Sequence, residues 1–208
     1  RLRGIRDRHN PAILHGGPFA NFAHGCNSAI ATRLSLKLAD YVVTEAGFGA
    51  DLGAEKFLDI KCRYAGLHPA AVVLVATVRA LKSHGGVAKP DLGKPNAEAV
   101  RAGSVNLARH IETLQGFGLP VCVAINAFPT DAAEEMDVIY DVCSKAGVPC
   151  ALSEVFAKGG EGGKALAETV LSILDDSAEV QYTYELDAPL TDKIEAVATK
   201  IYRAGRVS

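Results

Sequence analysis

The chain has 208 residues, which is enough for one α/β domain with a sizeable core, or for one and a half smaller ones. Hydrophobic residues make up 49% and charged residues 22%, a balance that is typical of globular proteins and argues against disorder. The net charge of -2, with both signs interspersed, argues against a nucleic-acid partner, because binding to phosphates needs a basic surface. No apolar stretch is long enough to span a bilayer, so no membrane partner is expected.

The N-terminal residues and the cysteines indicate the cellular compartment. The basic first residues are not followed by an apolar core, so they do not form a signal peptide. The only methionine is Met136, so the sequence is expected to begin inside a longer reading frame. The cysteines include no CxxC pair and no metal-ligand cluster with histidine, which predicts free thiols, no metal site and a cytoplasmic location. They are Cys26, Cys62, Cys122, Cys143 and Cys150.

Short β-branched runs alternate with longer helical stretches, the pattern of βαβ units. Strands are expected at 41–45, 71–77, 121–125 and 149–155. Helices are expected at 54–64, 97–114, 131–146, 162–174 and 191–202, with an extended stretch at 180–186. Thr130 or Asp131 is expected to cap the helix that Gly147 ends. The predicted fold class is α/β, with a mostly parallel sheet covered by helices on both faces.

Two glycine-rich segments follow predicted strands. Gly47–Gly53 has GxGxxxG spacing, which suits either close approach to a phosphate or a simple turn of the chain. This spacing imitates a dinucleotide-binding fingerprint, which also includes an acidic residue that binds the ribose. Here the next strand ends in Arg79, where that acidic residue would be expected. Gly159–Ala165 resembles a phosphate-binding loop, but it is one residue too short and has Ala165 in place of Ser or Thr.

Three further segments carry candidate site residues. His15–Ser28 mixes glycine, histidine, asparagine and phenylalanine, which favours a ligand loop, and it contains a possible but weak Cys26–His24 nucleophile pair. Lys82–Gly86 either orients an anionic substrate or forms a solvated loop. Phe128 and Phe156 follow successive strands, so their rings either hold a flat ligand between them or pack locally.

Long stretches of the chain resemble the formate–tetrahydrofolate ligase family, and the likeness covers nearly all of it apart from residues 1–14. The fold is then expected to be similar to that of P-loop NTPases. The stretches are HGGPFANFAHGCNS (His15–Ser28), ADYVVTEAGFGADLGAEKF (Ala39–Phe57), VATVRALKSHGG (Val75–Gly86), AINAFPTD (Ala124–Asp131) and SEVFAKGGEGG (Ser153–Gly163).

The resemblance implies an enzyme that joins formate to tetrahydrofolate with ATP, through formyl phosphate. It implies nucleotide and formyl-phosphate contacts at Ala20, Phe48, Gly49, Asp51 and Gly53. It also implies that Phe128 and Phe156 flank the folate ring, with Pro129 and Leu152 beside them. The family often has Trp where this chain has Phe156, so weaker stacking is expected. Further implications are ATP bound with Mg²⁺, a monovalent cation, and a homo-oligomer, a tetramer in the family.

The family's GxxxxGKT-type loop, the arginine after it and a KGGAAGGGY stretch do not occur in the chain. The chain alone is therefore expected to be an inactive fragment, since phosphoryl transfer needs positioned Lys, Arg and Mg²⁺. The expected organisation is a partial N-terminal segment with a ligand loop (1–38), a nucleotide- and folate-binding region (39–178) and a C-terminal extension (179–208). Two alternatives remain: a non-catalytic folate- or nucleotide-binding remnant, and a nicotinamide-dependent oxidoreductase.

Overall fold

The structure, a computed structural model, describes residues 3–7, 10–14 and 27–207. The chain divides into two compact units. One comprises the described residues up to His68 together with those from Val180 onward, and the other comprises Pro69–Glu179. The three-part division at residues 38 and 178 stays a prediction.

The Pro69–Glu179 unit is built on a three-stranded parallel sheet with the order β3-β4-β5. Its strands are β3 (Val72–Ala76), β4 (Val121–Asn126) and β5 (Cys150–Ser153). Val73 lies opposite Cys122, and Ala124 lies opposite Ala151. The predicted α/β class with parallel pairing is therefore confirmed in this unit.

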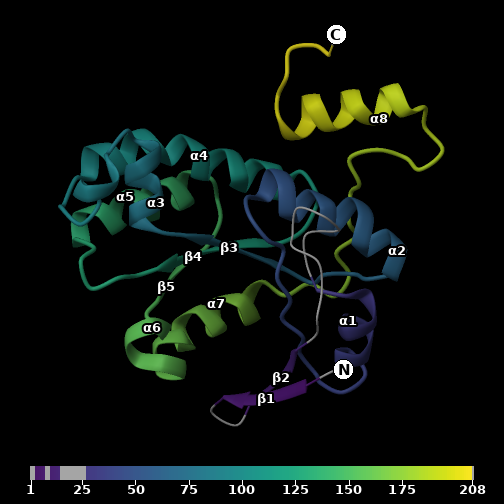
Figure 1. Cartoon of the computed structure of the whole chain (residues 1–208), viewed down its shortest axis with the longest axis horizontal. Coiled ribbons are helices and arrows are strands. Elements are labelled where there is room, and N and C mark those ends of the chain that lie inside the picture. Colours follow the sequence, from purple (N-terminus) through teal and green to yellow (C-terminus); the bar gives the residue numbers. More distant parts are fainter. Residues whose placement is uncertain (1–2, 8–9, 15–26, 208) are drawn as a thin grey trace. The chain divides into compact units, whose positions relative to one another are not determined.

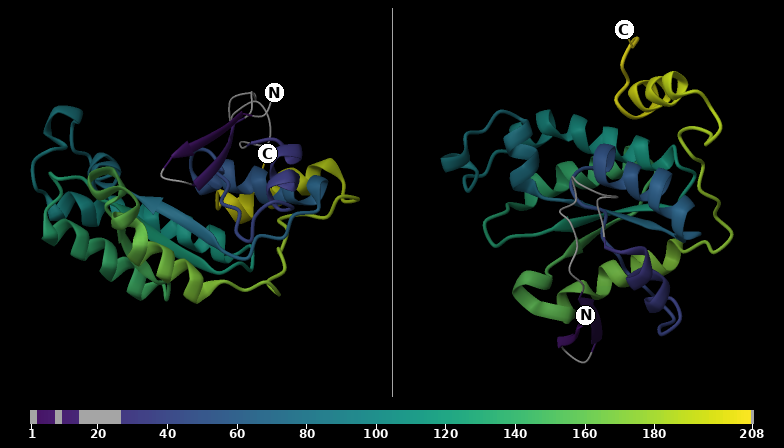
Figure 2. Two further views of the ribbon diagram at one scale, coloured as in Figure 1. Left: turned by 90° about the horizontal axis from the view of Figure 1, so that it is seen from below. Right: turned by 45° about the vertical axis from the view of Figure 1, so that its right-hand side comes forward.

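Helices cover both faces of this sheet, as predicted (Figure 1, Figure 2). On one face α4 (Ala97–Gln115) and α5 (Ala133–Lys145) pack, with α3 (Val78–His84) beside α4. On the other face α7 (Lys164–Ile173) packs on β4 and β5. Shorter helical turns lie between these elements: η3 (Lys89–Asp91), α6 (Val155–Lys158) and η4 (Gly159–Gly163). Strand β5 is shorter than expected, because the chain becomes helical after Ser153.

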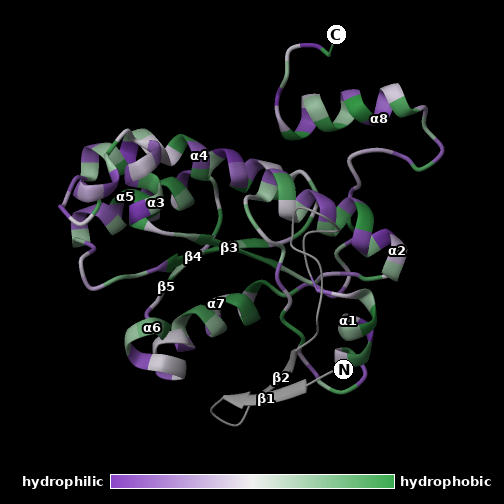
Figure 3. Cartoon of the chain, in the orientation of Figure 1, coloured by the Kyte–Doolittle hydropathy of each residue, from purple (hydrophilic) through white to green (hydrophobic). Residues whose placement is uncertain are grey.

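The core of this unit lies between the sheet and α4. All side chains of β4 from Val121 to Ile125 are buried, which explains the continuous apolar run of that strand. Helix α4 buries a stripe of side chains at helical spacing, and each contributes about 1.5–3 kcal/mol on burial. They include Val100, Leu107, Ile111 and Leu114. Figure 3 shows the apolar sheet strands and the mixed faces of the surrounding helices.

Strand β3 lies at an edge of the three-stranded sheet. Helix α7 contacts β4 and β5, so on its side of the sheet it covers the part that is farther from β3. On β3, Val73 is 38% exposed and Val75 is 62% exposed. This unit therefore carries an apolar edge strand that its own helices only partly cover.

The other unit is mainly helical. It contains α1 (Ala29–Ser35), a helix over residues 50–65 and a C-terminal helix formed by α8 (Leu190–Ala196) and η5 (Val197–Ile201). The helix over residues 50–65 comprises η1 (Ala50–Ala54), η2 (Phe57–Cys62) and α2 (Arg63–Ala65), and much of it is π-helical. An antiparallel hairpin joins β1 (Arg3–Asp7) to β2 (Asn10–Leu14). None of the helices in the described residues is long and apolar enough to cross a membrane.

The strand expected at 41–45 is wrong. These residues have no regular structure, and Tyr41 and Val43 are 68% and 97% exposed. A β-branched run becomes a strand only when a neighbouring strand pairs with it and its side chains pack. None of the described strands pairs with these residues. The helix expected at 54–64 is present, but it begins earlier, at Ala50, inside the glycine-rich segment Gly47–Gly53.

The cysteines behave as the sequence predicts within the described residues. Cys62, Cys122 and Cys143 are buried, Cys150 is half-buried, and all four are free thiols. Cys26 lies outside the described residues.

Candidate functional site

The glycine-rich turn before the helix over residues 50–65 has an unusual backbone. Phe48 has a φ of 66°, a left-handed conformation that a bulky residue rarely adopts. Its ring is 72% exposed, so burial of the ring does not offset the strain of about 1–3 kcal/mol. Such strain concentrates at functional positions, and the role of Phe48 at the nucleotide stays a prediction.

The glycine at position 53 is required by the turn itself. A Cβ atom there would lie 1.6 Å from the carbonyl oxygen of Gly47. The N–H groups of Leu52 and Gly53 donate to the carbonyl oxygen of Gly49 at 3.1 and 2.9 Å. Two donors of the helix start are therefore used internally, and a larger residue at Gly53 would move the turn whether or not a ligand binds there.

The other predicted nucleotide residues are placed unequally. Asp51 lies half-buried in the first turn of the helix, and its carbonyl oxygen accepts a hydrogen bond from the Tyr202 hydroxyl at 3.0 Å. Ala20 and most of the predicted ligand loop His15–Ser28 lie outside the described residues. The lack of a strand before Gly47 also removes the strand–turn–helix geometry on which the nicotinamide alternative depended.

The described end of the predicted ligand loop forms a polar cluster that sequence reasoning missed. The side-chain oxygen of Asn27 accepts hydrogen bonds from Lys61 Nζ at 2.6 Å and from the Thr32 hydroxyl at 2.9 Å. Ser28 caps α1 by accepting from the N–H of Ala31 at 3.1 Å. Lys61 is fully buried, and nothing in the local sequence distinguishes it from the exposed lysines of other helices.

Two carboxyl groups lie one turn apart in the helix over residues 50–65. Glu55 is 9% exposed and borders a shallow groove of about 410 Å³, whose wall includes Tyr184, Lys193 and Tyr202. Burial, followed by the negative charge of Asp59, raises the pKa of Glu55 to about 7. Burial also raises the pKa of Asp59, against the hydrogen bonds from Thr183 and the charges of Arg63 and Lys200. The charge of Lys56 lowers the pKa of Glu55, but by less than burial and Asp59 raise it.

We expect Glu55→Gln to reduce the pH dependence of stability. Because the folded-state pKa of about 7 lies above the ordinary value of 4.5, the folded protein binds this proton more tightly than the unfolded chain. The contribution of Glu55 to stability is therefore fully present at pH values below the ordinary pKa of 4.5, and it is lost as the pH rises towards 7. Urea-unfolding midpoints of parent and variant at pH 5, 6, 7 and 8 test this. The unfolding midpoint of the variant should rise relative to that of the parent as the pH rises. The same pH dependence in both proteins would contradict the raised pKa of Glu55.

Phe128 and Phe156, the predicted folate rings, come together at the carboxyl end of the sheet. Their centroids are 6.1 Å apart and the ring planes are tilted by 43°. Phe156 lies in α6 and is 75% exposed, and Phe128 is half-buried after β4. Beside them lie Pro129, which is exposed, and Leu152, which is half-buried on β5.

The two rings contact each other in this conformation. A flat ligand between parallel faces needs contact distances of about 3.5 Å on each side, or about 7 Å between the rings. The two phenylalanine rings would therefore have to move slightly apart and become more nearly parallel to admit a ligand ring between them. The exposure of Phe156 allows a change of its side-chain rotamer, since few neighbours hold it.

Arg79 is a residue of this cluster that sequence reasoning did not assign to it. Its guanidinium carbon lies 5.0 Å from the Phe128 ring centroid, and it donates to the Thr130 hydroxyl at 3.2 Å. It follows β3, so three neighbouring strands each contribute a residue at one edge of the sheet, where open α/β folds bind ligands. Its position three residues after an apolar strand was the available signal.

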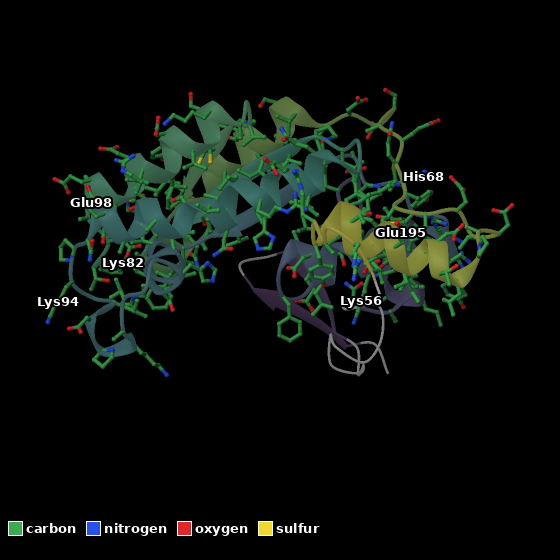
Figure 4. All side chains as sticks on the ribbon, turned by 90° about the horizontal axis from the view of Figure 1, so that it is seen from above. Lys56, His68, Lys82, Lys94, Glu98 and Glu195 are labelled. Carbon is green, nitrogen blue, oxygen red and sulfur yellow. The ribbon has the colours of Figure 1, made fainter. Side chains whose placement is uncertain are left out.

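Neither alternative for Lys82–Gly86, an anion-orienting segment or a solvated loop, holds at Lys82. Lys82 belongs to α3 and is fully buried, and its ammonium group lies 2.8 Å from Glu135 and 3.0 Å from the carbonyl oxygen of Lys94. Figure 4 shows Lys82 and Lys94 at the same end of this unit, and the Lys94 side chain extends outward. Lys82 therefore serves the fold, because a paired and fully buried ammonium cannot also meet a substrate.

Glu135 is the centre of that arrangement. Its carboxylate accepts from the N–H groups of Asn96 at 2.8 Å and Ala132 at 2.9 Å as well as from Lys82. Burial would raise the pKa of Glu135, but the hydrogen bonds from Lys82, Ala132 and Asn96 outweigh it and lower the pKa. The predicted cap of α5 at Thr130 or Asp131 is wrong, since the helix begins after Ala132.

The second glycine-rich segment forms structure of its own. Gly159–Gly163 is a 3₁₀ turn between α6 and α7, and the carbonyl oxygen of Gly162 accepts from the N–H of Glu154 at 2.9 Å. A Cβ atom at Gly162 would lie 2.5 Å from the Glu154 backbone, so close packing requires this glycine. The segment therefore supports the start of α7 and the turn that carries Phe156.

Comparisons with known proteins identify the family to which this sequence belongs. The sequence model of the formate–tetrahydrofolate ligase family matches residues 7–208, so the weak likeness expected for residues 1–14 is confined to those before Asp7. A formate–tetrahydrofolate ligase from Granulibacter bethesdensis is 58% identical over 201 residues, which cover 96% of this chain. The chain spans about a third of that relative's length, 35%. The chain therefore belongs to the formate–tetrahydrofolate ligase family.

Proposed function

We propose that the chain supplies the folate-binding surface, and part of the nucleotide-binding surface, of an enzyme that ligates formate to tetrahydrofolate with ATP. The observation that carries this proposal is the 58% identity to a protein of that name across 96% of the chain. The aromatic pair at the carboxyl edge of the sheet and the strained turn at Phe48 support it. Both features lie within the matched region.

In the proposed reaction a formate oxygen attacks the γ-phosphorus of ATP, giving formyl phosphate and ADP. An amine nitrogen of tetrahydrofolate then attacks the formyl carbon, phosphate leaves, and the nitrogen loses its proton. Ala20 and the turn residues Phe48, Gly49, Asp51 and Gly53 would face the nucleotide and formyl phosphate. ATP would enter with Mg²⁺, which neutralises phosphate charge, and Asp51 carries the oxygen ligands that this ion prefers.

The folate ring would lie between Phe128 and Phe156, with Pro129 and Leu152 at its border. The rings would hold and orient the flat ligand, and the apolar border would exclude water from the reacting nitrogen. A homotetramer, a monovalent-cation requirement and a cytoplasmic location are parts of the same proposal. Light scattering and the dependence of turnover on K⁺ or NH₄⁺ would examine the first two.

The activity test uses two proteins. The purified 208-residue chain, given ATP, formate and tetrahydrofolate, is expected to form no 10-formyltetrahydrofolate, because it lacks the GxxxxGK[ST] loop. A hybrid in which this chain replaces the matched 201 residues of the Granulibacter bethesdensis relative is expected to turn over. A hybrid that folds and assembles but stays inactive would favour the non-catalytic remnant, and turnover by the chain alone would refute the dependence on that loop.

Loss of either ring should weaken folate binding by roughly tenfold, because an aromatic pair contributes about 0.5–1.5 kcal/mol beyond burial. The measurement is tetrahydrofolate and ADP affinity by calorimetry on the hybrid carrying Phe128→Ala or Phe156→Ala. Phe156→Trp should hold or improve folate affinity, since the larger ring offers a wider face.

Val105→Ala is the matched control, because Val105 is an exposed apolar residue on α4 of the same unit. It should leave both affinities unchanged. Folate affinity within twofold of the parent in both ring variants, or a selective loss of ADP affinity, would refute the aromatic clamp.

A further inference from the structure

The segment Val180–Tyr202, called here the C-terminal arm, is held against the helix over residues 50–65 within one compact unit. The Asp59 carboxylate accepts a hydrogen bond from the backbone N–H of Thr183 at 2.8 Å. Both residues are buried, at 1% and 4% exposure. A buried carboxylate that receives a backbone hydrogen bond fixes the arm at one defined position along the helix.

Arg63 makes a second attachment one turn further along the helix. Its guanidinium carbon lies 3.9 Å from the ring centroid of Tyr182 and 5.0 Å from that of Tyr184. It also donates to the backbone carbonyl oxygen of Tyr184 and lies 3.6 Å from Asp59. Stacking on aromatic faces combined with a directed hydrogen bond is a role that lysine cannot reproduce.

The far end of the arm reaches the other end of the same helix. Lys200 Nζ donates to the carbonyl oxygen of Thr183 at 2.7 Å, which ties the C-terminal helix to the buried part of the arm. The Tyr202 hydroxyl donates to the carbonyl oxygen of Asp51 at 3.0 Å. The arm therefore contacts the helix at its first turn and again near its last.

We propose that the C-terminal arm is a brace for the nucleotide-binding turn, and that Tyr202 is a positioning residue for it. Gly49 is the N-cap of the helix, which begins at Ala50, and Gly53 packs so closely on Gly47 that movement of the first helical turn moves the loop before it. A bond from Tyr202 to the carbonyl of Asp51 thus restrains the segment that carries Phe48 and Gly49. The brace deepens the proposed function and rests on it for the identity of the ligand.

The test compares Tyr202→Phe with the parent chain by hydrogen–deuterium exchange of residues 47–53. Removing one hydroxyl keeps the ring, so the fold should persist, and exchange in the turn should become faster. In the hybrid enzyme the KM for ATP should rise about two- to tenfold, the range expected for one hydrogen bond, with the KM for tetrahydrofolate unchanged. Tyr140→Phe, in α5 of the other unit, is the control and should change neither.

Arg63 provides a second test of the same brace. Arg63→Ala should speed exchange in both the arm and the turn. Arg63→Lys should show the same faster exchange, because lysine keeps the charge but lacks the planar guanidinium that stacks on the tyrosine rings. Unchanged exchange of residues 47–53 in both Tyr202→Phe and Arg63→Ala would overturn the brace. Faster exchange of residues 47–53 with no rise in the KM for ATP of the hybrid enzyme would support the brace and refute the nucleotide role of the turn.

Discussion

Glu135→Ala is expected to lower the free energy of unfolding of the Pro69–Glu179 unit by about 3–5 kcal/mol. The substitution leaves the Lys82 ammonium buried without its carboxylate, and it removes the acceptor of two backbone N–H groups, those of Asn96 and Ala132. Burial of an uncompensated charge accounts for most of the expected loss. Urea unfolding followed by far-UV circular dichroism measures it.

An exposed ion pair of the same helix supplies the control. Asp141 lies 2.6 Å from Lys145 on the surface of α5, and Asp141→Ala should cost no more than about 1 kcal/mol. The Glu135 effect also has a pH signature: its folded-state pKa is lowered, so its contribution is present above the ordinary value of 4.5 and is lost as the pH falls through the folded-state pKa. Equal losses in the two variants would contradict the central role of Glu135.

Gly103→Ala is expected to destabilise the protein by about 1–3 kcal/mol, although alanine is the better helix former by about 1 kcal/mol. The reason is the contact between α3 and α4. A Cβ atom at Gly103 would lie 1.9 Å from the carbonyl oxygen of Leu81 and 2.9 Å from the backbone nitrogen of Gly85. Both atoms are backbone, so the helices would have to move apart. The urea midpoint of the variant measures the loss.

Gly93→Ala is the matched control for the helix contact. Nothing lies within 4 Å of a Cβ atom at Gly93, and its φ is not in the left-handed region. Alanine there should be neutral or slightly stabilising, because it reduces the freedom of the unfolded chain. If Gly103→Ala also stabilised the protein, the close approach of α3 and α4 would be refuted.

Sequence reasoning succeeded where one local pattern determines an element. The strands at 72–76 and 121–126 and the long helix at 97–115 have continuous apolar runs or helical spacing, and their predicted bounds fall within a residue or so of those observed. Gly147 ends α5 with a φ of 69°, as its residue type indicated. These features depend on neighbours in sequence, so the sequence was sufficient.

Errors arose where distant residues decide the outcome. Residues 41–45 have high β-propensity, but a strand also requires a partner. The burial of Lys82 depends on Glu135, 53 positions later, and no local sequence pattern indicates that ion pair. The bracing of the helix by Tyr202 likewise joins residues 151 positions apart. The approach of Phe128 to Phe156 was predictable because both follow adjacent parallel strands, whereas their tilt was not.

The edge strand β3 has a consequence for handling this chain. Val72–Ala76 contains no charged residue and no proline, which are the residues that natural edge strands use to prevent intermolecular pairing. Its high β-propensity and exposed Val75 make it a template on which a strand from another molecule can add. We therefore expect this strand to limit the solubility of the 208-residue chain, and we expect dilute, low-temperature conditions to disfavour aggregation.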